Sequence, residues 1–175
     1  MLTILVVSSL ISLVFCVSTP EWQNLNCEAG HRYLFSEVKM TWEEARGECQ
    51  LYGGWLVDLR TRQEQNCLIR YAQAAGVPED WYWHDGKIKI FTSRIIITLS
   101  LVNSLETKGV FMHAKDNTEA EWINDWSCSA DKTWGYLGND YIELGIWFKT
   151  YPHLTGFWCD NGATTLHHFI CESLI

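Results

Sequence analysis

The chain has 175 residues, of which 47% are hydrophobic and 19% are charged, and its formal net charge is −8. This length supports one well-packed core and is short for two independent domains. Because the acidic balance comes with no run of Lys and Arg, the sequence argues against a nucleic-acid partner.

The first 18 residues are uncharged, hold a long apolar stretch and end in small residues, which is the pattern of a signal peptide. We therefore expect residues 1–18 to be removed on export and residues 19–175 to form a single domain. A membrane anchor is the alternative, and the short stretch with no basic cluster after it disfavours that reading. The mature chain is expected to be secreted and to carry no anchor.

Cleavage after Ser18 would remove Cys16 and leave an even number of cysteines. These six are Cys27, Cys49, Cys67, Cys128, Cys159 and Cys171. In a chain bound for an oxidising compartment they predict three disulfides. None of their spacings is the close pair of a structural zinc site.

Two helices are predicted in the first half of the chain. Thr41, followed three residues later by Glu44, has the spacing of a capping box and begins a helix over residues 41–51 that Gly53 and Gly54 end. A second helix is predicted from about residue 61 to residue 75, with a glycine and a proline shortly after it.

Short apolar and aromatic segments predict strands over residues 55–59, 81–83, 109–113, 157–159 and 167–171. Residues between Ser127 and Gly156 are rich in Gly, Asp, Asn, Ser and Thr, and we expect a long irregular region there. Loops of this length are often functional.

The order of these motifs is informative. In chain order they are Tyr33-Leu34-Phe35-Ser36, Thr41-Trp42, Glu44-Ala45-Arg46, Cys49, Gly53-Gly54-x-Leu56-Val57, Glu64, Tyr82-Trp83, Gly109-Val110-Phe111, Trp158-x-Asp160 and Phe169-Ile170-Cys171-Glu172. This order resembles that of the C-type lectin-like domain, and it looks most like secreted single-domain lectins of invertebrates. The resemblance spans the chain from Cys27 to Glu172.

The resemblance implies an α+β fold in which two helices flank small antiparallel sheets, with a long irregular loop region and disulfide staples. It also implies a bond between Cys49 and Cys171. We hypothesise that Cys128, in the loop, is bonded to Cys159, in the strand that meets this loop in calcium-binding relatives. Elimination then pairs Cys27 with the remaining cysteine, Cys67, whereas a bond between Cys27 and Cys128 would overturn the whole assignment.

Relatives that bind sugar usually hold calcium with a Glu-Pro-Asn or Gln-Pro-Asp triplet and a Trp-Asn-Asp strand. Here that strand reads Trp158-Cys159-Asp160, so a thiol replaces the amide oxygen that calcium requires. The triplet is also missing from residues 126–132. We therefore expect no cofactor, with calcium possible only through non-standard ligands, of which Glu143 and Asp160 are the first candidates.

The candidate ligand-binding residues follow from the same resemblance and from the aromatic faces on which sugars pack. They are Asn139, Asp140, Glu143, Asp160, Trp126 and Trp134. The expected binding surface is the loop from about residue 127 to residue 156, with Trp126 just before it and Asp160 after it. Trp147 and Trp158 are further aromatic candidates, although Trp158 is expected to be core, as its family counterpart is.

Residues 87–104 form an insertion in the family pattern, rich in isoleucine and without proline. They could fold as a hairpin against the domain, and the alternative is translated non-coding sequence.

His84 and His113 stand where relatives carry apolar or aromatic residues, and His167 and His168 lack a third metal ligand at a diagnostic spacing.

The sequence contains no catalytic motif, so we expect no enzyme activity. The expected function is recognition of a glycan or an extracellular protein surface, in innate recognition, with a degenerate calcium site. The alternative is a calcium-independent protein-binding module, an inhibitor or a structural component that binds no sugar.

Overall fold

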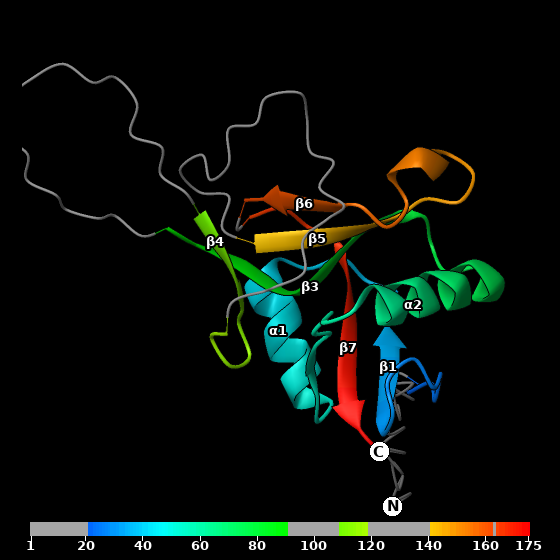
Figure 1. The fold of residues 1–175 in the computed structure, drawn as a ribbon, viewed down its shortest axis with the longest axis horizontal. Coiled ribbons are helices and arrows are strands. Elements are labelled where there is room, and N and C mark those ends of the chain that lie inside the picture. The colour runs from blue at the N-terminus through cyan, green and yellow to red at the C-terminus, as the bar shows by residue number, and fades with distance from the viewer. Residues whose placement is uncertain (1–20, 91–108, 119–140, 163) are drawn as a thin grey trace, which may run out of the picture.

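The computed structural model describes residues 21–90, 109–118, 141–162 and 164–175 (Figure 1). The elements in chain order are β1 (His31–Phe35), α1 (Trp42–Leu51), β2 (Trp55–Leu56), α2 (Arg62–Ala75), β3 (Asp80–Ile90), β4 (Gly109–His113), β5 (Tyr141–Ile146), the short 3-10 helix η1 (Pro152–Leu154), β6 (Trp158–Asn161) and β7 (His168–Leu174).

Both predicted helices are confirmed, and local chemistry explains their ends. The Glu44 N–H donates to Thr41 Oγ1 at 3.4 Å, while the Thr41 N–H donates to Glu44 Oε2 at 3.0 Å, which completes the capping box of α1. Gly53 follows α1 with φ of 78°, a left-handed conformation that glycine adopts without strain. Gly76 ends α2 in the same way, with φ of 69°.

Within the described residues, seven strands form one sheet in which the strand order is β1-β7-β3-β5-β6, with β2 paired to β7 and β4 paired to β3. The β3–β7 pair is parallel and the other pairs are antiparallel. In Figure 1, β1 and β7 run side by side with α1 on one flank and α2 on the other. This is the α+β arrangement expected from the sequence.

The core has two parts, one under each helix. Leu68 of α2 packs with buried residues that include Tyr33, Tyr82 and Ile142. The part under α1 is built by Trp42, Ala45, Cys49, Leu56, Trp83, Ala114, Phe169 and Cys171. Burial of these large apolar side chains is the main source of the fold's stability.

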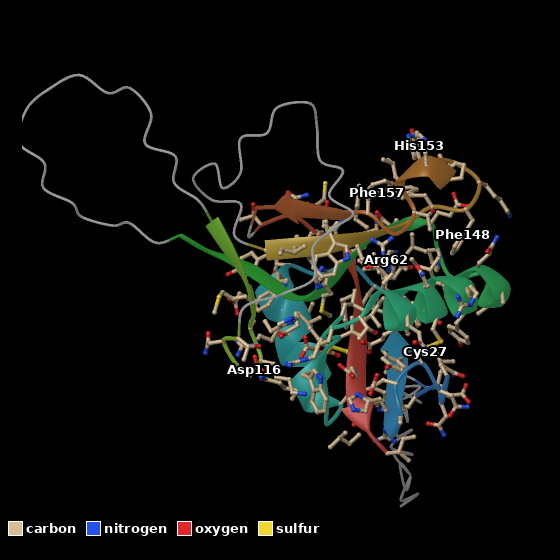
Figure 2. The ribbon with its side chains drawn as sticks, in the orientation of Figure 1. Cys27, Arg62, Asp116, Phe148, His153 and Phe157 are labelled. Carbon is tan, nitrogen blue, oxygen red and sulfur yellow. A yellow bond between two sulfur atoms is a disulfide. The ribbon has the colours of Figure 1, made fainter. Side chains whose placement is uncertain are left out.

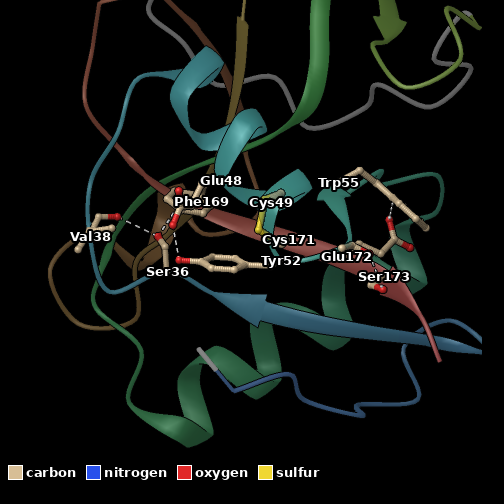
Figure 3. The surroundings of a disulfide bond; sticks show 11 residues. Ser36, Val38, Glu48, Cys49, Tyr52, Trp55, Phe169, Cys171, Glu172 and Ser173 are labelled. Carbon is tan, nitrogen blue, oxygen red and sulfur yellow. Dashed lines mark hydrogen bonds between the residues drawn. A yellow bond between two sulfur atoms is a disulfide. The ribbon is translucent and has the colours of Figure 1, made fainter. Parts of the chain in front are cut away.

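Two disulfides tie the helices to distant parts of the chain. Cys27 is bonded to Cys67 of α2, and Cys49 of α1 is bonded to Cys171 of β7. Figure 3 shows the second bond crossing from α1 to β7 beside Tyr52. Both pairings are those expected from the sequence.

The expectation of an irregular region over residues 127–156 is wrong for β5. This strand carries Ile142, Leu144 and Ile146 into the core, and even Glu143 and Gly145 between them are buried. Because both faces of β5 are covered, the alternation of apolar and polar residues that marks a half-exposed strand is weak. The turn-forming residues on either side of β5 weaken the strand signal further.

The first four residues of the insertion extend β3, which pairs with β4 from Gly86↔His113 to Ile90↔Gly109. Residues 91–108 lie outside the described residues, so the origin of the insertion stays open.

Neither described helix has the length and apolar character needed to cross a membrane. The expected signal peptide also lies outside the described residues.

Candidate functional site

The strand that holds calcium in sugar-binding relatives corresponds to β6, at one end of the strand order. Its partner is β5, with Leu144 opposite Trp158, Glu143 opposite Cys159 and Ile142 opposite Asp160. The two strands therefore bring the predicted ligand residues Glu143 and Asp160 to neighbouring positions of one ladder.

Trp158 lies in the core, as expected. Its side chain is buried, its indole Nε1 donates to Gln65 Oε1 of α2 at 2.6 Å, and its ring lies 4.4 Å from that of His84. The tryptophan therefore holds β6 against α2 and offers no face to a ligand.

Glu143 lies in a buried polar cluster with Asn161 and His167. Only 2% of Glu143 is exposed, and its Oε2 lies 2.7 Å from His167 Nε2 and accepts from Asn161 Nδ2 at 3.3 Å. The Asn161 Oδ1 atom in turn accepts from the N–H of Gly162 and the hydroxyl of Thr165, both at 2.8 Å. The Glu143 carboxylate is thus oriented by protein groups.

The described residues of this ladder do not fit calcium, which needs six to eight oxygen ligands. The Glu143 carboxylate is engaged by His167 and Asn161, and Cys159 is disulfide-bonded, so it has no free thiol. Asn161 is a member of the cluster that the sequence did not single out. Its partner Glu143 lies 18 positions away, and no local spacing signals the contact.

Several predicted residues lie outside the described residues. These are Trp126, Trp134, Asn139, Asp140 and Cys128, together with the side chain of Asp160. The Cys128–Cys159 bond and the ligand roles of the other residues therefore stay predictions.

The connection from β5 to β6 is the described part of the predicted binding surface. The Glu79 carboxylate accepts hydrogen bonds from the N–H groups of Phe148, Lys149 and Thr150 at 3.0, 2.5 and 2.9 Å. The Thr150 hydroxyl donates to the same carboxylate at 2.6 Å. Four hydrogen bonds to one carboxylate hold this loop in a defined shape.

Aromatic rings cover the outer part of this loop. Tyr151 is 47% exposed, and its ring meets Trp147 edge to face at 5.3 Å and His153 at 6.4 Å. Figure 2 shows His153 at the rim of the molecule, on the far side of β5 and β6 from α1. Exposed rings held in place by packing are suited to contact a sugar or a protein.

No family model matches the chain. The chain is 30% identical over 135 residues to C-type lectin 37Db of Drosophila melanogaster, which covers 76% of this chain and 73% of that protein.

Solved structures share the fold at lower identity. The mouse scavenger receptor C-type lectin carbohydrate-recognition domain matches with a TM-score of 0.60 and 21% identity, covering 89% of this chain and 97% of that one. The C-type lectin CEL-I from Cucumaria echinata matches with a TM-score of 0.59 and 20% identity, covering 86% and 93%. A calcium-independent type II antifreeze protein matches with a TM-score of 0.57 and 15% identity, covering 87% and 91%. With the fold shared and the Drosophila relative similar over most of both chains, this chain belongs to the C-type lectin family.

Proposed function

We propose that the protein is exported and acts in innate recognition, where it binds a glycan-bearing surface without calcium. The uncharged apolar leader and the disulfides support export, because disulfides persist in oxidising compartments. Family membership supports a recognition role.

The observation that carries calcium independence is the state of the β5–β6 ladder. Glu143 is bound to His167 and Asn161. Cys159, which lies opposite it, has no oxygen in its side chain and is disulfide-bonded. Neither of these paired positions therefore offers calcium a free oxygen ligand. The neighbour that is a calcium-independent type II antifreeze protein supports this proposal, because its fold is shared with this chain.

The proposed contact surface is the β5–β6 connection, with Tyr151 at its centre. The loop is held by Glu79, so its rings are ordered before a ligand arrives, and ordering costs little on binding. The mouse scavenger receptor neighbour is a carbohydrate-recognition domain, which favours sugar as the first ligand class to test.

The test is a glycan array probed with the oxidised mature protein, once in calcium and once in EDTA. We expect the same glycans to be bound in both buffers. Replacing Tyr151 with alanine should weaken binding about 10-fold, the loss typical of an aromatic residue at the centre of a contact. The matched control is Leu51→Ala, which removes another exposed apolar side chain, at the end of α1. Binding that disappears in EDTA would contradict the proposal.

A protein ligand is the second candidate, and one observation favours it. The polar groups of Glu143 and Asn161 are satisfied inside the domain, so on the described ladder they are not offered to sugar hydroxyls. An empty glycan array, with Tyr151-dependent capture of one purified extracellular protein, would select this candidate.

A further inference from the structure

A second buried polar cluster lies away from the β5–β6 ladder. It is formed by Asp58, which follows β2, Asp85 of β3 and His113 at the end of β4. These residues are 5%, 2% and 7% exposed, and one ligand atom from each lies within 4.8 Å of the other two. Three separate segments thus deliver two carboxylates and an imidazole to one point in the interior.

The two carboxylate oxygens of Asp58 have different partners. Its Oδ2 accepts from Arg60 Nε at 2.6 Å, whereas its Oδ1 faces His113 Nδ1 in an ion pair. Asp85 uses Oδ2 to accept the Lys115 N–H at 2.8 Å. The Asp58 oxygen and the imidazole nitrogen of His113 therefore already meet in the interior, and a cation bound at this point would lie between them.

His84 adds an unsatisfied group beside the cluster. It is buried, and its Nε2 has no hydrogen-bond partner.

The charges around the cluster fit a divalent cation. Arg60 also bonds Asp116 at 2.5 Å, so the local set is three carboxylates, one guanidinium and the imidazole. With neutral His113 as a ligand, these groups carry a net charge of about −2, which a divalent ion neutralises.

The donor types favour zinc over calcium. Zinc binds imidazole nitrogen and carboxylate oxygen at about 2.0–2.2 Å in a tetrahedral shell, so its ligand atoms stand roughly 3.3–3.6 Å apart. In the structure the three ligand atoms lie within 4.8 Å of one another, with those of Asp58 and His113 in direct contact, so zinc binding would move these two side chains apart. Calcium needs six to eight oxygens, which two carboxylates cannot supply.

We propose that Asp58, Asp85 and His113 bind one zinc ion, with water as the fourth ligand. The ion joins β4 to β3 and to the turn that precedes α2. Arg60 bonds both Asp58 and Asp116, and Figure 2 shows Asp116 in the turn that follows β4, at the surface.

The test is calorimetric titration of zinc chloride into the oxidised, metal-stripped mature protein without a histidine tag. We expect one zinc per chain, a raised melting temperature, and the visible absorption bands of tetrahedral cobalt when cobalt(II) is used instead. Asp85→Asn keeps the oxygen that accepts the Lys115 N–H and removes the charge, and His113→Phe removes the nitrogen. Each should weaken zinc binding about 100-fold or more.

The matched control is His167→Gln, which alters the other buried histidine–carboxylate pair and should leave zinc affinity unchanged. The proposal is overturned if the wild-type protein binds no zinc saturably, if folded Asp85→Asn binds it as tightly as wild type, or if His167→Gln abolishes binding. Equal binding of calcium at the same residues would also overturn it. Should His113→Phe fail to fold, Asp85→Asn and the cobalt spectrum decide. None of these readouts depends on glycan binding.

Discussion

Glu64 of α2 is a buried carboxyl group whose protonation is coupled to folding. Its Oε1 accepts the Tyr33 hydroxyl at 2.8 Å. Burial, reinforced by the charge of Glu172, raises the pKa of Glu64 from 4.5 to about 7. Between these values the native state keeps a proton that the unfolded chain has lost, so stability falls as the pH rises through this window.

Replacing Glu64 with glutamine should remove that fall, which for a shift of this size is on the order of 3 kcal/mol. The measurement is urea unfolding of both proteins at pH 5 and pH 7. The quantity compared is the change in the free energy of unfolding between the two pH values, which is measured for wild type and for the variant. If this change is the same in both proteins, Glu64 is not the group responsible for the fall in stability.

The β5–β6 connection depends on one residue from the turn between α2 and β3. The hydroxyl of Thr150 and the N–H groups of Phe148, Lys149 and Thr150 stabilise the Glu79 carboxylate and lower its pKa. The ionised Glu79 carboxylate therefore stabilises the loop. This stabilisation is lost as the pH falls through the lowered pKa of Glu79.

Glu79→Ala should accelerate hydrogen exchange at the amides of residues 148–150 and weaken ligand capture through Tyr151, with little change elsewhere. Glu37→Ala, which removes an exposed glutamate at another place on the surface, is the control. Unchanged exchange at these amides in Glu79→Ala would mean that the loop is held by its other contacts, such as that of Thr155 with Trp147.

At the scale of the whole molecule, the two described disulfides close loops of very different length. The Cys49–Cys171 bond spans 122 positions and the Cys27–Cys67 bond spans 40. In the chain-entropy model, removal of the longer link costs about 5 kcal/mol and removal of the shorter one about 4 kcal/mol.

The matched comparison is a double alanine variant of each pair, unfolded in urea. The Cys49–Cys171 pair should show the larger loss, because it ties α1 to β7 across most of the domain. A larger loss for the Cys27–Cys67 pair would show that local packing, and not loop closure, dominates the contribution of these bonds.

The sequence by itself determined the features that depend on neighbours along the chain. Thr41 and Glu44 lie within one helical turn, and Gly53 and Gly76 follow helices directly, so the helix bounds could be predicted. The order of motifs from Tyr33 to Glu172 is also a property of the sequence alone, and it pointed to the family.

The tertiary structure decided what depends on distant contacts. It made β5 a buried strand in a turn-rich region, it paired Glu143 with His167 and Asn161, and it brought Asp58, Asp85 and His113 together. Sequence periodicity reports which side of one element is covered, whereas these groups meet only after strands pair across long stretches of chain. Burial then fixes their partners, because an unpaired polar group in the interior is costly.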